Sequence, residues 1–455
     1  MKSKKSSIWP AVAVGIVLLF ALFATAEAKD SEIVRVAVAK AGRFMEFSAD
    51  VRYQVVDQAG GRVVATVLPK ERWTVENRDS RLYLSCNGNT YGPFSGSLLV
   101  QSEEMVASIV TQDGQLLENT ALGNLTAINA EGKNVSLARR DRIFVRTAAG
   151  QTELSTGKQS GLLTLSPGGP SSRYRGDLLF MRENGELLAV NRVGLEDYLR
   201  GVVPVEMYSS WPTEALKAQA VVSRTYALQR IRESQKLPYD LTSDQYSQVY
   251  SGYNAEMPST NRAVEETAGQ VVMNQGRLVE AFFHSSSGGF TENSEEVWLT
   301  AEPAIKTKAD PYDYNDRHYN WRVNYTSLQL IEKLRDYGDF KEITDIRLSY
   351  TTSGARVQEM TVVGTGRDGS SIKKSIANAD RVRAALGLKS ALFTMDKTYD
   401  GNNRISGVQI YGSGFGHGLG MSQFGAKGMA DQGYSYREIL HFYYTDVVIA
   451  DDYGW

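Results

Sequence analysis

The chain has 455 residues, of which 42% are hydrophobic and 22% are charged, and its formal net charge at pH 7 is -2. This length exceeds that of a typical single domain, so we expect two or three domains of ordinary globular composition with a sizeable core. The near-neutral charge gives no electrostatic footprint for nucleic acid, which we exclude as a partner.

Residues 1–28 have the pattern of a secretory signal peptide. Lysines precede an apolar run from Ile8 to Phe23, and small-residue motifs that end at Ala26 and Ala28 offer cleavage sites. An uncleaved membrane anchor is the alternative, because the run nearly reaches the length of a membrane span. We therefore expect an exported protein in the periplasm, the cell wall or the extracellular space, with membrane contact only through this segment if it is uncleaved.

Residues 29–170 read as a β-rich accessory region. Apolar and polar residues alternate, as in Ile33–Ala39, and glycine turns separate the alternating runs. The only cysteine, Cys86, cannot form an internal disulfide, and its strand-like flanks predict a buried thiol. The stretch from Ser160 to Ser172 contains Gly-Gly-Pro and predicts a boundary before a second domain, residues 171–455.

The second domain mixes helices and strands. It begins with a hairpin that turns at Asn184-Gly185, followed by a short helix from Leu195 to Arg200. Further elements are expected as helices near 327–337, 378–386 and 436–444 and strands near 343–350 and 355–364. The last helix should begin with a capping box formed by Ser435 and Glu438.

Glu206 is the candidate for acid chemistry. We expect it on a loop that opens into a long helix, with Ser209 or Ser210 as the cap and Pro212 in the first turn. Its sequence neighbours are apolar: Val202, Val203, Pro204, Val205, Met207 and Trp211. Apolar surroundings disfavour the charged carboxylate and raise its pKa towards the range of a general acid. The alternative is a surface glutamate on a loop beside a helix cap.

Four blocks in the second domain occur in a specific order. They are Tyr198–Met207 with Glu214–Tyr226, then Ser247–Tyr250 (SQVY), His284–Gly289 (HSSSGG) and Gly414–Gly425 (GFGHGLGMSQFG). Together they resemble the signature of the stage II sporulation protein D (SpoIID) and amidase-enhancer (LytB) family, over roughly residues 170 to 447. The resemblance implies a lytic transglycosylase of peptidoglycan glycan strands, with Glu206 as the acid/base.

Such an enzyme cuts the bond between the muramic acid and glucosamine units with one carboxylate, whereas hydrolysis usually needs two. The 6-hydroxyl of muramic acid replaces water, and the products carry 1,6-anhydro ends. The residues expected to bind the substrate are Ser247, Gln248, Tyr250, His284, Ser287, His417, Ser422 and Gln423. Tyr250 is expected to be available for stacking, and His284 and His417 are expected on the walls of one cleft with Glu206.

Two alternatives at this site involve metal and further acids. Some relatives bind zinc through the histidine that matches His284 and two nearby cysteines, but no cysteine follows His284 here. We therefore expect no metal and no cofactor, and His284 either bonds at the cleft or is structural. Glu292, Glu295 and Glu296 could supply a second carboxylate, although solvated surface acids are the more common outcome.

The expected fold class is α+β, with a β-rich N-terminal region and a mixed α/β catalytic domain with a cleft. The expected partners are peptidoglycan glycan strands and, in the enhancer alternative, a cell-wall amidase, in cell-wall remodelling or sporulation. The alternative function is that of a non-catalytic peptidoglycan-binding enhancer of an N-acetylmuramoyl-L-alanine amidase.

Overall fold

The computed structural model describes residues 32–102, 161–298 and 300–451, and the backbone of six short strands between residues 106 and 154. The expected signal peptide lies outside the described residues. The chain divides into two units, Met1–Lys29 with Glu103–Gln159, and Asp30–Ser102 with Ser160–Trp455. The first unit contains three antiparallel pairs: β9 (Val106–Val110) with β10 (Leu116–Ala121), β11 (Thr126–Ile128) with β12 (Asn134–Ser136), and β13 (Ile143–Thr147) with β14 (Gly150–Leu154).

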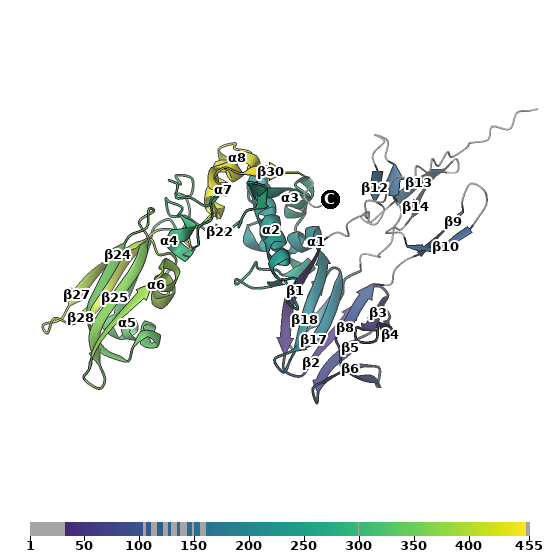
Figure 1. The fold of residues 1–455 in the computed structure, drawn as a ribbon, viewed down its shortest axis with the longest axis horizontal. Coiled ribbons are helices and arrows are strands. Elements are labelled where there is room, and N and C mark those ends of the chain that lie inside the picture. Colours follow the sequence, from purple (N-terminus) through teal and green to yellow (C-terminus); the bar gives the residue numbers. More distant parts are fainter. Residues whose placement is uncertain are drawn as a thin grey trace, which may run out of the picture. The chain divides into compact units, whose positions relative to one another are not determined.

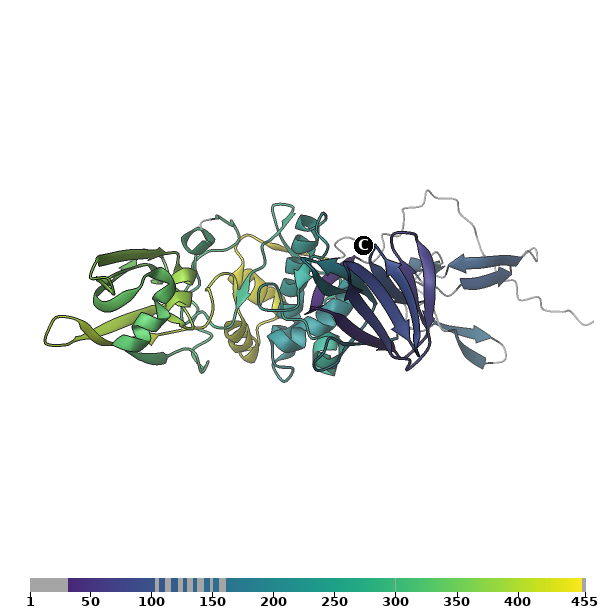
Figure 2. The ribbon, with the colours of Figure 1, turned by 90° about the horizontal axis from the view of Figure 1, so that it is seen from below.

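Two mainly antiparallel sheets begin the second unit (Figure 1). The first has the order β19 (Leu241–Thr242), β1 (Ile33–Ala41), β18 (Glu186–Gly194), β17 (Asp177–Glu183), β8 (Leu98–Ser102), β3 (Tyr53–Asp57) and β4 (Arg62–Val67). The second has the order β16 (Ser172–Tyr174), β15 (Leu163–Ser166), β2 (Phe44–Ala49), β5 (Trp73–Arg78), β6 (Arg81–Cys86) and β7 (Asn89–Phe94). Figure 2 shows these strands from below, coloured purple to teal.

One hydrophobic core joins the two sheets. The rings of Phe47 and Phe180, one from each sheet, lie 5.4 Å apart, and Cys86 is a buried free thiol as expected. Strands from both sides of residue 170 share each sheet, because β1 pairs with β18 and β15 pairs with β16. The functional division into residues 29–170 and 171–455 stays a prediction. The hairpin turn at Asn184-Gly185 is confirmed, and both of its residues have the positive φ that such a turn requires.

Helix α1 (Leu195–Glu206) corrects the expectation that Glu206 lies on a loop. The helix continues through Pro204, although proline removes one backbone hydrogen bond. Its buried face, which includes Leu199, Val202 and Val203, packs into the core, and Met207 N–H closes the last turn by bonding to Val203 O at 3.0 Å. Burial of this face offsets the lost bond, since tertiary packing supplies most helix stability.

Helix α2 (Thr213–Glu233) follows, and Pro212 is its N-cap without a side-chain cap bond. The expected cap by Ser209 or Ser210 is therefore wrong. A turn in which Trp211 N–H bonds to Tyr208 O at 2.9 Å lies between α1 and α2 and separates these serines from the start of the helix. Next come η3 (Gly252–Ala255) and α3 (Pro258–Glu266).

A second hydrophobic core packs against the other face of α2. Its elements are β20 (Val271–Asn274), β22 (Phe283–His284), α4 (Ser294–Trp298), β29 (Met421–Ser422), α7 (Gln423–Asp431), α8 (Tyr436–Tyr443) and β30 (Val448–Ala450). Strand β21 (Arg277–Leu278) pairs with β20, and its Leu278 belongs to the first core. The capping box of Ser435 and Glu438 before α8 is confirmed.

A third hydrophobic core belongs to the segment between α4 and β29. It joins two three-stranded sheets, β23 (Trp321–Thr326), β28 (Ile405–Gly412) and β27 (Phe393–Tyr399), and β24 (Phe340–Tyr350), β25 (Val357–Gly366) and β26 (Ser371–Ala377). Its helices are α5 (Ser327–Lys333), η4 (Arg335–Tyr337) and α6 (Ala379–Leu386). Helix α5 begins at Ser327 and is capped by Thr326 rather than by Ser327 itself, and Gly387 ends α6 in the left-handed conformation.

The fold class is α+β, as expected from the sequence. None of the helices in the described ranges combines the length and the apolar character that a membrane span requires.

A buried ion pair connects α1 to α2. Arg224, buried on α2, donates from Nε and Nη2 to the two oxygens of Glu196 at 2.7 Å each, and from Nη1 to Gln270 O at 3.1 Å. Arg224→Ala should lower the free energy of unfolding by about 3 kcal/mol, because it leaves buried acceptors unpaired. Arg335→Ala is the matched control, since Arg335 pairs with Glu332 in solvent and should cost under about 0.5 kcal/mol. Equal urea-unfolding midpoints for the two variants would contradict this assignment.

Candidate active site

Glu206 is the last residue of α1, and two segments distant in sequence hold its carboxylate. Val249 N–H donates to Oε1 at 3.1 Å, and Gln423 Nε2 donates to Oε2 at 3.4 Å. The side chain remains partly exposed. The carboxylate is thus fixed in place and still within reach of a ligand.

The pKa of Glu206 is raised above its ordinary value. Burial is the largest cause, and the hydrogen bonds from Val249 and Gln423 act in the opposite direction. The position at the C-terminal end of α1 adds to the effect, because the negative end of the helix dipole disfavours a carboxylate. This is the raised pKa that the apolar neighbours predicted.

A short polar chain from α2 anchors Gln423. Gln423 Nε2 lies 3.4 Å from Gln219 Oε1, and Gln219 in turn donates to Ser223 Oγ at 3.0 Å. Ser422, the residue before Gln423, caps α7 by accepting from Gly425 N–H at 3.1 Å. The Gln219 contact and the cap by Ser422 position the side-chain amide of Gln423 that bonds to the Glu206 carboxylate.

A row of aromatic rings comes from residues that are close in sequence to Glu206 and Gln423. Tyr208 is 58% exposed, its ring centroid lies 5.7 Å from that of Trp211, and Trp211 lies 4.8 Å from Phe424. Tyr208 comes two residues after Glu206, and Phe424 directly follows Gln423. This aromatic row was not predicted, because only the tertiary structure brings Phe424 to Trp211.

The loop before η3, residues 247–250, contributes a backbone N–H to the site rather than side chains. Tyr250 is buried, and its hydroxyl donates to Asn191 Oδ1 at 2.7 Å. The expected availability of Tyr250 for stacking is therefore wrong, because its ring lies in the core. Gln248 is also buried and accepts from the Tyr198 hydroxyl at 3.1 Å, and Ser247 Oγ accepts from Thr242 N–H at 3.1 Å. These two side chains hold the loop whose Val249 amide reaches Glu206.

The two histidines lie together. The ring centroids of His284 and His417 are 5.5 Å apart, and the His417 ring lies 4.9 Å from that of Trp298. His284 Nδ1 lies 3.0 Å from Leu419 O, and its buried Nε2 meets no partner among the described residues. Burial lowers the pKa of His284, and it lowers the pKa of His417 to about 4, so both rings are neutral at pH 7.

A strand pairing links these histidines to the carboxylate. His284 on β22 pairs with Ser422 on β29, and Gln423, the next residue, bonds to Glu206. The expectation that both imidazoles line one cleft with Glu206 stays a proposal.

Ser287 is fully buried, and its hydroxyl bonds to another part of the protein rather than facing a ligand. Its hydroxyl donates to Asp313 Oδ2 at 3.0 Å, and the same oxygen accepts from Ser286 Oγ at 2.8 Å and Gly288 N–H at 2.8 Å. Ser287 N–H also lies 3.4 Å from Ser422 Oγ. Asp313 therefore holds the loop that follows His284.

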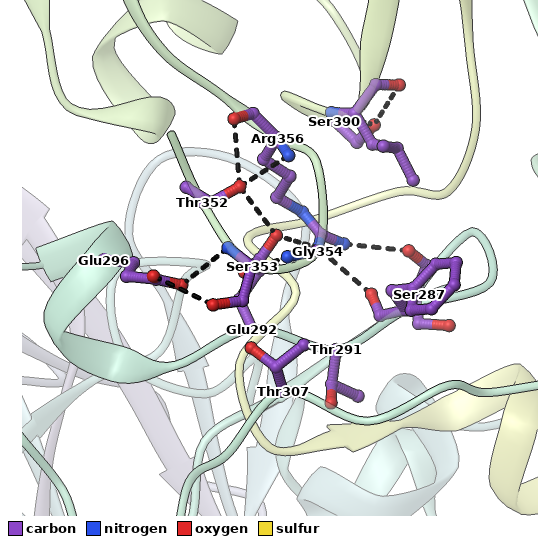
Figure 3. A network of polar contacts seen from close by, with 12 residues as sticks. Ser287, Thr291, Glu292, Glu296, Thr307, Thr352, Ser353, Gly354, Arg356 and Ser390 are labelled. Carbon is purple, nitrogen blue, oxygen red and sulfur yellow. Dashed lines mark hydrogen bonds and ion pairs between the residues drawn. The ribbon is translucent and has the colours of Figure 1, made fainter. Parts of the chain in front are cut away.

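A buried ion pair joins this loop to the glycine-rich loop of His417. Arg356 donates to Glu292 Oε1 at 3.0 Å and to Ser287 O at 2.8 Å, and Figure 3 shows its side chain between these two residues. Thr352 Oγ1 adds a bond to the same Glu292 oxygen at 3.1 Å. The guanidinium lies directly against Gly418, where an added Cβ would meet Cζ at 2.4 Å.

This network corrects the expectation that Glu292 is a surface acid or a second catalytic carboxylate. Glu292 is fully buried and neutralised by Arg356. Glu296 accepts from Ser353 N–H at 2.9 Å, and Glu295 pairs with Lys306 at 3.4 Å. All three acids thus have structural partners.

The described part of the chain contains no group of three histidine, cysteine, aspartate or glutamate side chains arranged to hold a metal ion. Cys86 belongs to the core of the two sheets, whereas His284 lies on β22. The expectation of no metal and no cofactor stays a prediction.

Comparison with known proteins is consistent with these features. The family described as stage II sporulation protein matches residues 183–274, and a domain of unknown function (DUF8618) matches residues 263–420. Stage II sporulation protein D of Bacillus subtilis is 30% identical over 58% of this chain and 76% of its own length. An uncharacterized protein of Brachyspira hyodysenteriae is 33% identical over 61% of this chain and 72% of its own.

The amidase enhancer of Bacillus subtilis is 32% identical over 55% of this chain, which spans 40% of that protein's length. The chain belongs to the stage II sporulation protein D family.

Substitution of Gly418 tests the packing of the His417 loop on Arg356. Gly418→Ala should destabilise the fold by about 2 kcal/mol more than Gly433→Ala, because overpacking adds to the strain of a positive φ. Gly433 is the matched control, since its φ of +92° resembles the +86° of Gly418 but no atom lies within 4 Å of its added Cβ. Thermal unfolding measures both, and equal losses would show that Arg356 does not pack as described.

Proposed function

We propose that this protein acts on the bacterial cell wall as a lytic transglycosylase of peptidoglycan glycan strands. The observation that carries the proposal is the partly exposed Glu206 with a raised pKa and two defined hydrogen-bond donors. Family membership supports it, because relatives are named for sporulation and for enhancement of an amidase. Action on the wall places the functional site outside the cytoplasmic membrane.

In the first step, protonated Glu206 donates its proton to the glycosidic oxygen between muramic acid and glucosamine. The C–O bond breaks, glucosamine leaves with the proton, and positive charge develops on the muramic ring. The raised pKa favours the protonated carboxyl that this step needs. The amide groups of Val249 and Gln423 stabilise the carboxylate that results.

In the second step, the Glu206 carboxylate accepts the proton of the muramic 6-hydroxyl. The hydroxyl oxygen bonds to the anomeric carbon, which closes the 1,6-anhydro ring and restores the acid. One carboxylate therefore suffices, and the burial of Glu292 in an ion pair agrees with this.

The aromatic row supports sugar binding beside the carboxylate. Tyr208 is exposed, and Trp211 and Phe424 extend the same row. Aromatic rings are suited to the apolar faces of sugars, as amphipathic side chains with large contact areas. The histidine pair is proposed to line the same cleft from the β22 and β29 side.

A second candidate function is that of a non-catalytic enhancer of a cell-wall amidase. The observation that favours it is the 32% identity with the amidase enhancer of Bacillus subtilis. In that case Glu206 and the aromatic row would bind glycan without cutting it, and an amidase would be the partner.

Replacement of Glu206 distinguishes the two candidates. The wild-type chain should release fragments with 1,6-anhydro-muramic ends from purified glycan strands, detected by mass spectrometry. Glu206→Gln should keep the fold but reduce this release at least about 1000-fold, because the amide has the same size and no titratable proton. Glu332→Gln is the control, since that acid lies on α5 and pairs with Arg335 in solvent.

Fragments with reducing muramic ends would refute the transglycosylase route. Full activity in Glu206→Gln would assign the acid to another residue. Glycan binding with no cleavage by the wild-type chain would favour the enhancer.

The pH dependence of cleavage tests the role of Gln423. The acid form of Glu206 is required, so kcat/KM should fall as the pH rises through its pKa. The Gln423 hydrogen bond lowers this pKa, so Gln423→Met should move the alkaline limb to higher pH. Gln409→Met, on the exposed side of β28, should leave the limb unchanged. If the alkaline limb of Gln423→Met moves to lower pH or does not move, the hydrogen bond from Gln423 to Glu206 does not act as described.

A further inference from the structure

A separate pocket of about 370 Å³ opens beside the start of α1. It lies between β16, η3 and the first turn of α3. Its polar lining residues are Arg173, Arg175, Tyr253, Asn254, Glu256 and Asn261. None of them belongs to the site around Glu206 or to the four blocks of the sequence.

The charges in this pocket leave one cation without an acidic partner. Arg175 donates to both oxygens of Glu256, at 2.6 and 3.0 Å, and lies 3.9 Å from Asp197. Arg173 instead donates from Nε to the amide oxygen of Asn254 at 3.2 Å, and its two terminal nitrogens bond to no residue in the described ranges. The pocket therefore presents an exposed guanidinium edge.

The ring of Tyr253 orients this guanidinium. Arg173 Cζ lies 4.8 Å from the ring centroid, and Arg175 Cζ lies 5.0 Å from it. A guanidinium held by stacking and by one Nε bond presents its two terminal donors in a fixed plane, which matches the two oxygens of a carboxylate. At about 370 Å³ the pocket has the size of a small-ligand site.

The pocket also lies at a defined separation from Glu206. Asp197, beside Arg175, is in the first turn of α1, and Glu206 ends the same helix nine residues later. At 1.5 Å per residue this is about 14 Å along the helix axis. A second contact joins the two regions, because Ser259 Oγ at the start of α3 donates to Ser209 O at 2.7 Å. A glycan chain of a few sugars spans such a separation.

We propose that this pocket binds a carboxylate group carried by the glycan strand, several sugars away from the bond at Glu206. Arg173 makes the bidentate contact, and Tyr253 holds it in position. The proposal rests on the proposed function, since glycan strands of the wall are the ligand. Muramic acid bears a lactyl carboxyl that is either free or linked to a peptide with its own carboxylates, so the shared chemistry is the carboxylate.

Calorimetric titration of the full chain carrying Glu206→Gln tests this with three defined oligosaccharide probes. The probes are a muramic acid–glucosamine hexasaccharide with free lactyl carboxyls, the same compound with each carboxyl converted to a methylamide, and the peptide-bearing form. Adding Arg173→Ala should weaken binding of one acidic form about 10-fold and leave binding of the methylamide unchanged. Whichever acidic form responds identifies the source of the carboxylate.

Arg322→Ala is the matched control, because Arg322 also stacks on a tyrosine, with Cζ 5.2 Å from the Tyr411 ring, but lies on β23. Arg322→Ala should leave the affinity for all three probes unchanged.

If Arg173→Ala weakens binding of all three probes equally, or weakens none of them, the proposed carboxylate contact is wrong. In the wild-type background, Arg173→Ala should raise KM with little change in kcat. Cleavage that continues with an unaltered KM would refute this inference alone, whereas a wild-type chain that neither binds nor cuts glycan would refute the proposed function as well.

Discussion

The carboxylate of Glu206 accepts a hydrogen bond from Gln423, which lies 217 residues later in the chain, and the proposed chemistry depends on this contact. Helix α1 brings Glu206 to the surface of the first core, while α7 brings Gln423 from the second core. Burial raises the pKa of Glu206. When the carboxylate forms, Val249 N–H and the Gln423 amide donate hydrogen bonds to it. These opposing effects suit one group that must donate a proton and then take one back.

The loops around this contact are held by buried polar groups rather than by apolar packing alone. Arg356 bonds to the Ser287 loop and packs on Gly418, and Asp313 binds the three donors after Ser285. Arg356 pairs with Glu292, and Asp313 accepts three hydrogen bonds, and these contacts offset the desolvation cost of burying the two charges. The His284 and His417 loops are therefore positioned by side chains from the segment between α4 and β29.

The sequence predicted the α+β class, the hairpin at Asn184-Gly185 and the raised pKa of Glu206, because local turn chemistry and apolar neighbours determine these features. It did not predict that α1 continues through Pro204, since tertiary burial outweighs the local penalty of proline. The partners of Glu292 and Tyr250 were also missed. Arg356 and Asn191 are distant in sequence, and neither contact follows from periodicity or spacing.

The account depends on a Glu206 carboxyl that stays protonated at higher pH than an ordinary glutamate. Carbon NMR titration of the full chain, with the Glu206 signal assigned by its loss in Glu206→Gln, measures this pKa directly. The account predicts a midpoint above the ordinary glutamate value, which is about 4.3. A midpoint at or below that value would contradict it, because Glu206 would then be a carboxylate under the conditions where it must act as an acid.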